Sequence, residues 1–254
     1  MKNEKSKFLV PQCLSALAPF KKSAFTLAEV LITLAIIGVV AAMTIPTLIA
    51  NYEKKLSVVR FQKAYAEIIQ AVKLAEAEYG SMNTWTFGNA SPDDMLASTK
   101  YFFENYLKIK TNKSCFPVSE ECWATTYTID GLPSFKSTMS QPSGYSAVMT
   151  KSGYTIFSQI GQGNHNIVID TNGKNKPNKL GKDVFLLIFD TDKQYVGVTH
   201  RSKHYDSEEE RIEARDKYCS SECESNGSIG HWCGISCGAV IFDNNWKIPE
   251  NYPW

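Results

Sequence analysis

The sequence predicts an α+β fold in which one long N-terminal helix packs on a small antiparallel β-sheet. Three observations lead to this prediction. An apolar run extends from Val30 to Tyr52 without a charged residue. The apolar residues that follow recur at helical spacing as far as Tyr79. Short strand-like runs separated by turn residues then occupy the C-terminal part. We therefore expect a helical rod followed by a compact head.

The apolar run is long enough to cross a membrane. About 20 apolar residues span the hydrocarbon core of a bilayer, and residues 25–50 provide them. Residues 1–24 hold five Lys and one Glu, a net charge of +4, which favours a cytoplasmic position for this end. The rest of the chain has 22 basic and 25 acidic residues, and this net charge of −3 gives no indication of nucleic-acid binding. A secretory signal peptide is one alternative, but the run is longer than the apolar region of a signal peptide, and the only weak cleavage site, at residues 39–41, lies in its middle. An uncleaved anchor is another, but it does not account for Glu29 inside the apolar segment.

The residues around the start of the run resemble the N-terminus of type IV prepilins and type II secretion pseudopilins. The basic stretch KKSA (21–24) is followed by FTLAE (25–29), where the family has a basic leader and then Phe-Thr-Leu-x-Glu. The resemblance implies that a prepilin peptidase removes residues 1–24 between Ala24 and Phe25, and that Phe25 is then N-methylated. Ala24 stands where the family more often has Gly. Gly38 and Pro46 fall where many pilins carry helix-weakening residues, which implies a local kink.

Glu29 has an expected role in assembly. A carboxylate in an apolar segment is costly, but cleavage would give Phe25 a free ammonium that can pair with Glu29 on a neighbouring helix. Removing one partner of such a buried pair costs roughly 3–5 kcal/mol. We therefore expect this pair to set the height at which a subunit enters a filament.

Residues 51–80 are expected to continue the helix beyond the membrane. Gly80 is a natural C-cap that would end it. Before that glycine, one apolar stripe follows alternating spacings of three and four residues, which is typical of an amphipathic helix. The stripe comprises Val58, Phe61, Tyr65, Ile68, Val72, Ala75 and Tyr79.

Residues 81–254 are expected to form an exported α+β head with about four strands. Residues 91–110 have a helical apolar face, and residues 145–160 predict a β-hairpin around the turn at 151–153. Residues 166–173 and 183–198 supply further strand-like runs. The resulting antiparallel sheet would lie on the second half of the long helix.

The cysteines support an exported head. Loss of the leader removes Cys13 and leaves six, which allow 15 pairings. Cys115 and Cys122 are close enough in sequence to pair with each other. The other four form C-x3-C…C-x3-C, for which we favour the nested pairs Cys219–Cys237 and Cys223–Cys233. A zinc site is the alternative, although its usual spacing is tighter.

The loop at residues 169–185 has two possible interpretations. Asp170, Asn172 and Asp183 offer side-chain oxygens for a calcium ion, with Asn175 or Asn178 as further candidates. The alternative is an Asx-rich turn that satisfies its own backbone. Calcium is therefore a possible cofactor, and the sequence indicates no other.

The function expected from these features is structural. As a prepilin-like protein, the chain would be a single-pass protein of the cytoplasmic membrane with an exported head. It would then become a subunit of a periplasmic pseudopilus or an extracellular pilus. Its partners would be the prepilin peptidase, other pilin or pseudopilin subunits and the inner-membrane assembly platform. The alternative is a membrane-anchored exported enzyme or binding protein. Gly234-Ile235-Ser236-Cys237-Gly238 matches a nucleophile elbow, but no strand-to-helix context accompanies it, so no catalytic residue is predicted.

Overall fold

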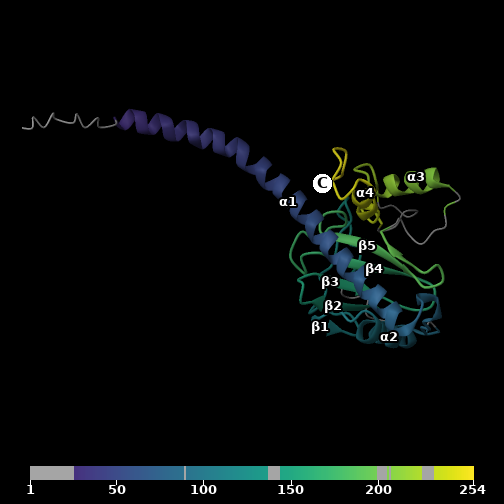
Figure 1. The fold of residues 1–254 in the computed structure, drawn as a ribbon. Helices are drawn as coiled ribbons and strands as arrows, with labels where there is room; N and C mark the ends of the chain where they lie inside the picture. The colour runs from purple at the N-terminus through teal and green to yellow at the C-terminus, as the bar shows by residue number, and fades with distance from the viewer. Residues whose placement is uncertain (1–25, 89, 137–143, 199–204, 206, 225–231) are drawn as a thin grey trace, which may run out of the picture. The chain divides into compact units, whose positions relative to one another are not determined.

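The computed structural model describes residues 26–88, 90–136, 144–198, 205, 207–224 and 232–254 (Figure 1). The longest element is helix α1 (Leu27–Tyr79). The chain divides into two compact units, with the boundary inside α1 between Leu48 and Ile49. Gly38 and Pro46 both lie within α1, and the helix continues through them without a break. The long helix predicted from the sequence is therefore present, and Pro46 lies two residues before the boundary.

The second half of α1 belongs to the core of the C-terminal unit. Its buried residues follow helical spacing, so they share one face. Phe61 is fully buried and stacks on Phe185 of the sheet with ring centroids 4.1 Å apart. Burying a side chain of this size contributes about 1.5–3 kcal/mol. Gly80 ends the helix with a φ of 86°, a left-handed conformation that glycine adopts without strain. The buried residues of α1 are Ser57, Val58, Phe61, Ala64, Ile68, Val72 and Ala75.

The sheet has six antiparallel strands in sequence order, β1-β2-β3-β4-β5-β6, rather than the four or so expected. Every neighbouring pair is connected directly along the chain. The two longest strands, β4 and β5, pair from Asn164 with Asp190 to Asp170 with Val184. The strands are β1 (Thr111–Cys115), β2 (Ser146–Thr150), β3 (Thr155–Ser158), β4 (Asn164–Asp170), β5 (Val184–Asp190) and β6 (Tyr195–Gly197).

Both faces of the sheet are covered. Phe185, Leu187 and Phe189 of β5 pack in one core cluster with α1, while Leu186 and Ile188 pack in a second cluster. This second cluster contains Trp123 and Phe135 from the long connection between β1 and β2, together with Ile235. Alternating residues of a strand point to opposite faces, so every residue of β5 is buried. Its nearly uninterrupted apolar sequence follows from burial on both sides.

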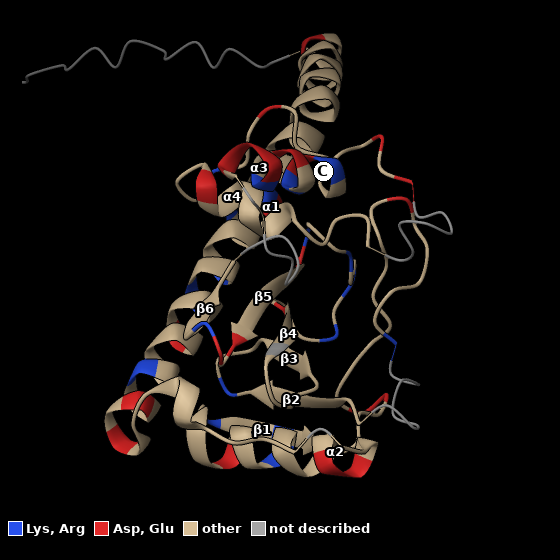
Figure 2. Cartoon of the chain, turned by 90° about the vertical axis from the view of Figure 1, so that its right-hand side faces the viewer, with Lys and Arg blue, Asp and Glu red and all other residues tan. Residues whose placement is uncertain are grey.

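Short helices complete the unit. Helix α2 (Pro92–Tyr101) begins at Ser91, whose hydroxyl accepts the Asp94 N–H, and runs into a π-helical turn, η2 (Phe102–Tyr106). Before it lies η1, a 3-10 turn (Met82–Thr84). Near the C-terminus are α3 (Glu208–Tyr218) and α4 (Cys237–Asp243). Arg211 and Arg215 of α3 each contact Asp243 of α4, at 3.0 and 2.6 Å, which joins the two helices. Figure 2 shows α3 next to α4, with both acidic and basic segments on α3.

Candidate functional site

The start of α1 is a capping box formed by Thr26 and Glu29. The Thr26 hydroxyl oxygen accepts the Glu29 N–H at 3.2 Å, and Glu29 Oε2 accepts the Thr26 N–H at 2.8 Å and the Thr26 hydroxyl at 2.9 Å. These bonds satisfy backbone donors that a helix start otherwise leaves unpaired. Glu29 therefore already has a local partner within its own chain. The expected cleavage site, Ala24 and Phe25, lies outside the described residues.

The first half of α1 is apolar and exposed. It contains an 18-residue window with a mean hydropathy of 2.3, none of which is buried within the chain. The helix is thus long and apolar enough to span a membrane, by length and composition. The large apolar side chains exposed here are Leu27, Val30, Leu31, Ile32, Leu34, Ile36, Ile37, Val39, Val40, Met43, Ile45, Leu48 and Ile49.

The second candidate site is the loop that joins β4 to β5. Asp170 is the last residue of β4 and pairs with Val184, so Asp170 and Asp183 lie on adjacent strand ends. Both residues are buried: Asp170 is 1% exposed and Asp183 is 4% exposed. Burial, followed by the charge of Asp183, raises the pKa of Asp170 to about 9. Burial also raises the pKa of Asp183, although backbone N–H donors oppose that shift.

Asp183 organises the turn through its two oxygens. Its Oδ1 accepts the Lys179 N–H at 2.7 Å, and its Oδ2 accepts the Asn178 N–H at 2.9 Å. The same Oδ2 accepts the side-chain amide of Asn172 at 3.0 Å. Asp183 thus has the role of an Asx-turn centre that holds the backbone of the loop.

Asp170 and Asn178 meet on the inner side of the same loop. Asp170 Oδ1 accepts the Asn172 N–H at 3.2 Å. One terminal atom of the Asn178 side-chain amide lies 3.0 Å from Asp170 Oδ2 and 3.0 Å from the carbonyl oxygen of Asn175. Asn178 has a φ of 51° and is 7% exposed, so the turn holds its side chain inside. The structure therefore brings Asp170, Asn172, Asn175, Asn178 and Asp183 together.

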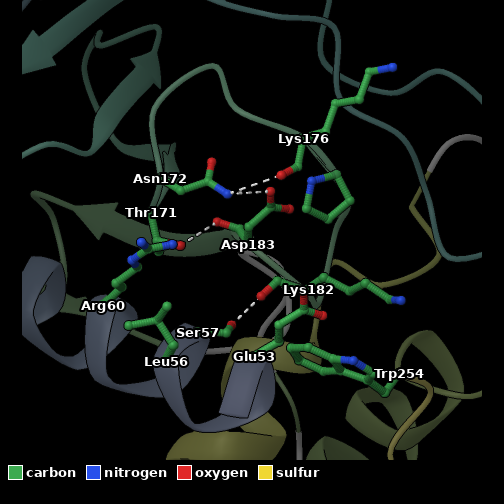
Figure 3. Close-up of a pocket in the computed structure, with 11 residues that line it drawn as sticks. Glu53, Leu56, Ser57, Arg60, Thr171, Asn172, Lys176, Lys182, Asp183 and Trp254 are labelled. Atoms are coloured by element: carbon green, nitrogen blue, oxygen red, sulfur yellow. Dashed lines mark hydrogen bonds between the residues drawn. The ribbon is translucent and has the colours of Figure 1, made fainter. Parts of the chain in front are cut away.

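A hollow of about 630 Å³ lies between α1 and this loop (Figure 3). Ser57 on α1 donates a hydrogen bond to the Lys182 carbonyl oxygen and so ties the helix to the loop. Lys54 and Lys182 lie 5.8 and 5.4 Å from the centre of the Trp254 ring, within the range of cation–π contacts. The lining residues are Glu53, Leu56, Ser57, Arg60, Thr171, Asn172, Lys176, Pro177, Lys182, Asp183 and Trp254.

Three disulfides hold the loops of the C-terminal unit. The structure joins Cys115 to Cys122, Cys219 to Cys237 and Cys223 to Cys233. This is the nested arrangement favoured from the sequence. Cys219 follows the last residue of α3 and Cys237 is the first residue of α4, so the longer bridge connects these two helices. Each of these six sulfurs is thus bonded to another cysteine sulfur.

The nucleophile-elbow match has no catalytic geometry. Ser236 is fully buried, and Cys237 within the motif forms a disulfide. Helix α4 begins within the motif, at Cys237, and the described residues before that helix, 232–236, form no strand. Among the residues that the structure describes, no group of three or more His, Cys, Asp and Glu side chains could hold a metal ion.

Comparison with known proteins gives two matches. Residues 47–254 match a family described as a family of unknown function (DUF6613). The chain belongs to this family. Residues 19–45 match the prokaryotic N-terminal methylation motif, which indicates a pilin- or pseudopilin-type protein. Neither the curated proteins nor the solved structures contain a significant match.

The match at residues 19–45 confirms the prepilin-type resemblance, and it is consistent with membrane anchoring and with a structural role. Sequence reasoning missed the capping partner Thr26, although the signal was present: Thr-x-x-Glu before an apolar run is a capping-box pattern. It also missed the hollow beside the loop. Arg60 and Trp254 are 194 positions apart in the numbering, and only the packed structure shows that they line one space.

Proposed function

We propose that this chain is a structural subunit of a type IV pilus-like filament or a type II secretion pseudopilus. A prepilin peptidase removes residues 1–24, and Phe25 becomes the methylated N-terminus. The observation that supports this proposal is the methylation motif at residues 19–45, directly followed by an exposed apolar helix. Other pilin-type subunits and an inner-membrane assembly platform are the partners that such assembly requires.

Glu29 supplies the proposed assembly contact. A subunit that enters a filament buries the apolar half of α1 among other helices, where an unpaired charge is costly. The ammonium of Phe25 on a neighbouring subunit would neutralise the Glu29 carboxylate. The capping box supports this role because it holds the carboxylate at the helix start, next to Thr26.

Intact-mass measurement of the protein from cell membranes tests the processing step. We expect a species that lacks residues 1–24 and carries one added methyl group. Cells without a prepilin peptidase should contain only the full-length form, which provides the control. A mature protein that begins at Met1 in normal cells, or one cleaved near Ala42, would contradict the proposal.

Electron microscopy with an antibody to the head distinguishes the two kinds of filament. Long labelled fibres at the cell surface would identify a pilus. Label confined to the envelope, together with a secretion defect when the gene is deleted, would identify a pseudopilus. Absence of both would favour a membrane-anchored binding protein or enzyme in place of a filament subunit.

A further inference from the structure

A second hollow of the C-terminal unit lies between α1 and the segment that follows α4. Its volume is about 650 Å³, and we call it the C-terminal groove. One wall is formed by residues 51–62 of α1 and the other by residues 246–250. Figure 1 shows the C-terminus beside α1, and Lys54 lies 5.8 Å from the centre of the Trp254 ring. A volume of this size is within the range of about 300–1,000 Å³ that small-molecule sites occupy.

The C-terminal groove begins where the membrane-spanning part of α1 is expected to end. Residues 27–48 form about 33 Å of helix at 1.5 Å per residue, and the hydrocarbon core of a bilayer is about 30 Å thick. Helix α1 continues without a break, and Asn51, the first residue of the groove, follows Leu48 within one turn. The groove therefore starts at the depth of the lipid headgroups.

The charge of the groove is positive. Lys54, Lys55 and Lys247 line it together with one acidic residue, Glu250, which gives a net charge of +2. Among the described residues, none of the ion pairs involves these three lysines. Their ammonium groups are thus available to an anion from outside the chain.

Apolar side chains lie beside these cations. Val58 is 7% exposed and belongs to the core, but its neighbour Val59 is 60% exposed. Trp246 and Ile248 line the groove from the C-terminal segment. Exposed apolar surface next to three cations matches a molecule that carries both an anionic group and a hydrocarbon chain.

The wall that carries Trp246 is fixed in place. Trp246 has a φ of 59°, a left-handed conformation that residues other than glycine seldom adopt. Its ring lies 5.4 Å from Phe61 and 5.3 Å from Tyr65, measured between ring centroids, and its backbone N–H donates to the Ile241 carbonyl oxygen at 2.9 Å. Such a conformation persists only where the surrounding structure imposes it, and it is common at ligand sites. The groove is therefore formed before a ligand arrives.

We propose that the C-terminal groove binds one anionic phospholipid from the leaflet on the side of the head. The phosphodiester contacts the ammonium groups of Lys54, Lys55 and Lys247, and an acyl chain lies along Val59 and Trp246. A zwitterionic lipid would bring its own cationic group among three lysines, so a headgroup with a net negative charge is favoured. The bound lipid holds the head at the membrane surface. This proposal rests on the membrane insertion of α1 that is part of the proposed function, but on neither cleavage nor assembly.

Native mass spectrometry of the full chain in detergent measures the affinity for single lipids. We expect one phosphatidylglycerol molecule to bind at least tenfold more tightly than phosphatidylcholine with the same acyl chains. The preference should weaken as the ammonium acetate concentration rises, because salt screens exposed charges. Equal affinity for the two lipids would overturn the proposal. A dimer that forms without lipid and prevents lipid binding would also overturn it, because a second copy of the chain would then cover the groove.

Alkaline extraction of cell membranes checks insertion separately. A chain that this treatment releases is not inserted, which would overturn both the lipid site and the proposed function. A chain that stays in the membrane but shows no lipid preference would contradict the lipid site alone.

A triple variant locates the anionic headgroup. Lys54→Gln, Lys55→Gln and Lys247→Gln together remove the three cations of the groove. Each lysine near an anionic lipid surface contributes up to about fivefold in affinity. The variant should therefore bind phosphatidylglycerol at least tenfold more weakly and lose its preference over phosphatidylcholine.

A matched triple variant provides the control. Lys73→Gln, Lys110→Gln and Lys151→Gln remove the same charge from exposed positions that do not line the groove. This protein should keep the preference of the natural chain. An equal loss in both triple variants would show that net charge, and not the groove, attracts the lipid.

Brominated acyl chains locate the lipid tail. Phosphatidylglycerol with brominated chains should quench part of the tryptophan fluorescence of the full chain. Trp246→Phe keeps an aromatic ring against Phe61 and Tyr65, and it should remove part of that quenching. The same absolute quenching in the natural chain and in this variant would place the acyl chain away from Trp246 and overturn the assignment of the groove.

Discussion

At the residue scale, Glu29 combines two roles that a single carboxylate can perform in succession. Within its own chain it accepts hydrogen bonds from Thr26 and starts α1. In the proposed filament it neutralises the Phe25 ammonium of a neighbour. A carboxylate has about four lone-pair sites, so capping does not exhaust its capacity. The two roles differ in one respect: capping requires an acceptor, while pairing requires a charge.

Substitutions at the start of α1 can separate these roles. Glu29→Gln retains an acceptor for the Thr26 N–H, because glutamine also serves in a capping box, but it removes the charge. We expect normal membrane insertion and loss of filament assembly. Thr26→Ala removes the hydroxyl that caps the helix, at a cost of about 0.5–2 kcal/mol in local stability, and retains the Glu29 charge. Assembly should persist in that variant.

Sheared-filament assays combined with membrane fractionation give the measurement. Glu29→Ala, which lacks both the acceptor and the charge, should insert and fail to assemble like the glutamine variant. Filaments built from Glu29→Gln at normal yield would show that the charge is dispensable and would remove the pairing role from Glu29.

His165 makes the stability of the head depend on pH. It lies in β4, and its Nε2 is 3.1 Å from the Gly161 nitrogen and 3.2 Å from the Gln162 carbonyl oxygen. Burial lowers the pKa of His165 below its usual 6.5, although nearby carbonyl groups and the charge of Asp190 oppose the shift. As the pH falls below 6.5, the unfolded chain takes up the proton first. The contribution of His165 to stability is therefore present at neutral pH and lost progressively below pH 6.5.

Urea unfolding at pH 7.5 and pH 5.5, in chelator, measures this effect. The loss of stability on acidification should be larger in the natural chain than in His165→Gln, which cannot titrate. Comparing the two proteins cancels the contributions of the buried carboxyl groups, which respond in the opposite direction. Equal losses in both proteins would show that His165 is protonated equally easily in the folded and unfolded chain.

At the element scale, a disulfide replaces part of the packing that helix α3 lacks. Helix α3 has no buried residue. Two Arg–Asp243 contacts and the Cys219–Cys237 bridge connect it to α4. Partly exposed ion pairs contribute little. The covalent bridge is therefore the stronger of the two connections between these helices.

Replacing Cys219 and Cys237 together by Ala should lower the free energy of unfolding by about 3 kcal/mol, as expected for a loop of this length. The shorter loop between Cys115 and Cys122, seven positions apart, should give a slightly smaller loss of about 2.5 kcal/mol in the same double replacement. Urea unfolding of both variants provides the comparison, with non-reducing peptide mapping to verify the remaining bridges. A loss below about 1 kcal/mol for Cys219/Cys237 would mean that contacts other than the bridge hold α3.

The elements that the sequence predicted are those with strong periodicity or clear turns. The apolar stripe and Gly80 predicted α1 almost to the residue, and the turn at 151–153 predicted the β2–β3 hairpin. Strand β1 was missed because its sequence, TNKSC, has one buried residue and low β-propensity, and its pairing with β2 across more than 30 residues depends on tertiary contacts. The sequence indicated β5 and β6 only as one long run, residues 183–198. In the structure, a turn after Asp190 separates the two strands.

The loop site shows the same limit on prediction. The sequence indicated which side chains offer oxygens, and it left a calcium site and a self-capped turn as alternatives. Hydrogen-bond direction could not be read from the sequence. Asp183, a candidate ligand from the sequence, accepts three N–H groups in the structure, and Asn178 has a positive φ and a buried side chain. Such assignments depend on three-dimensional geometry within one turn.

At the scale of the whole molecule, the expected and observed boundaries of the head differ in a way that matters for experiments. The sequence placed the head at residues 81–254, after the end of the helix. In the structure, the C-terminal unit begins at Ile49. Residues such as Phe61, Ile68 and Val72 of α1 fill the core against the sheet. The second half of α1 is therefore a part of the head, as much as any strand.

Truncation tests this division of the chain. A protein comprising residues 49–254, exported behind a cleavable signal peptide so that its disulfides can form, should be soluble and unfold cooperatively. A protein comprising residues 81–254 lacks the buried face of α1. Each large apolar side chain removed from a core costs about 2–5 kcal/mol. The combined cost of losing Phe61, Ile68 and Val72 is therefore about as large as the 5–15 kcal/mol by which a typical domain is stable. We expect this shorter protein to aggregate or to remain unfolded by circular dichroism. Both truncations retain all six cysteines, so differences between them cannot arise from the disulfides. Cooperative folding of residues 81–254 with the stability of residues 49–254 would show that α1 only rests on the head and contributes nothing to its core.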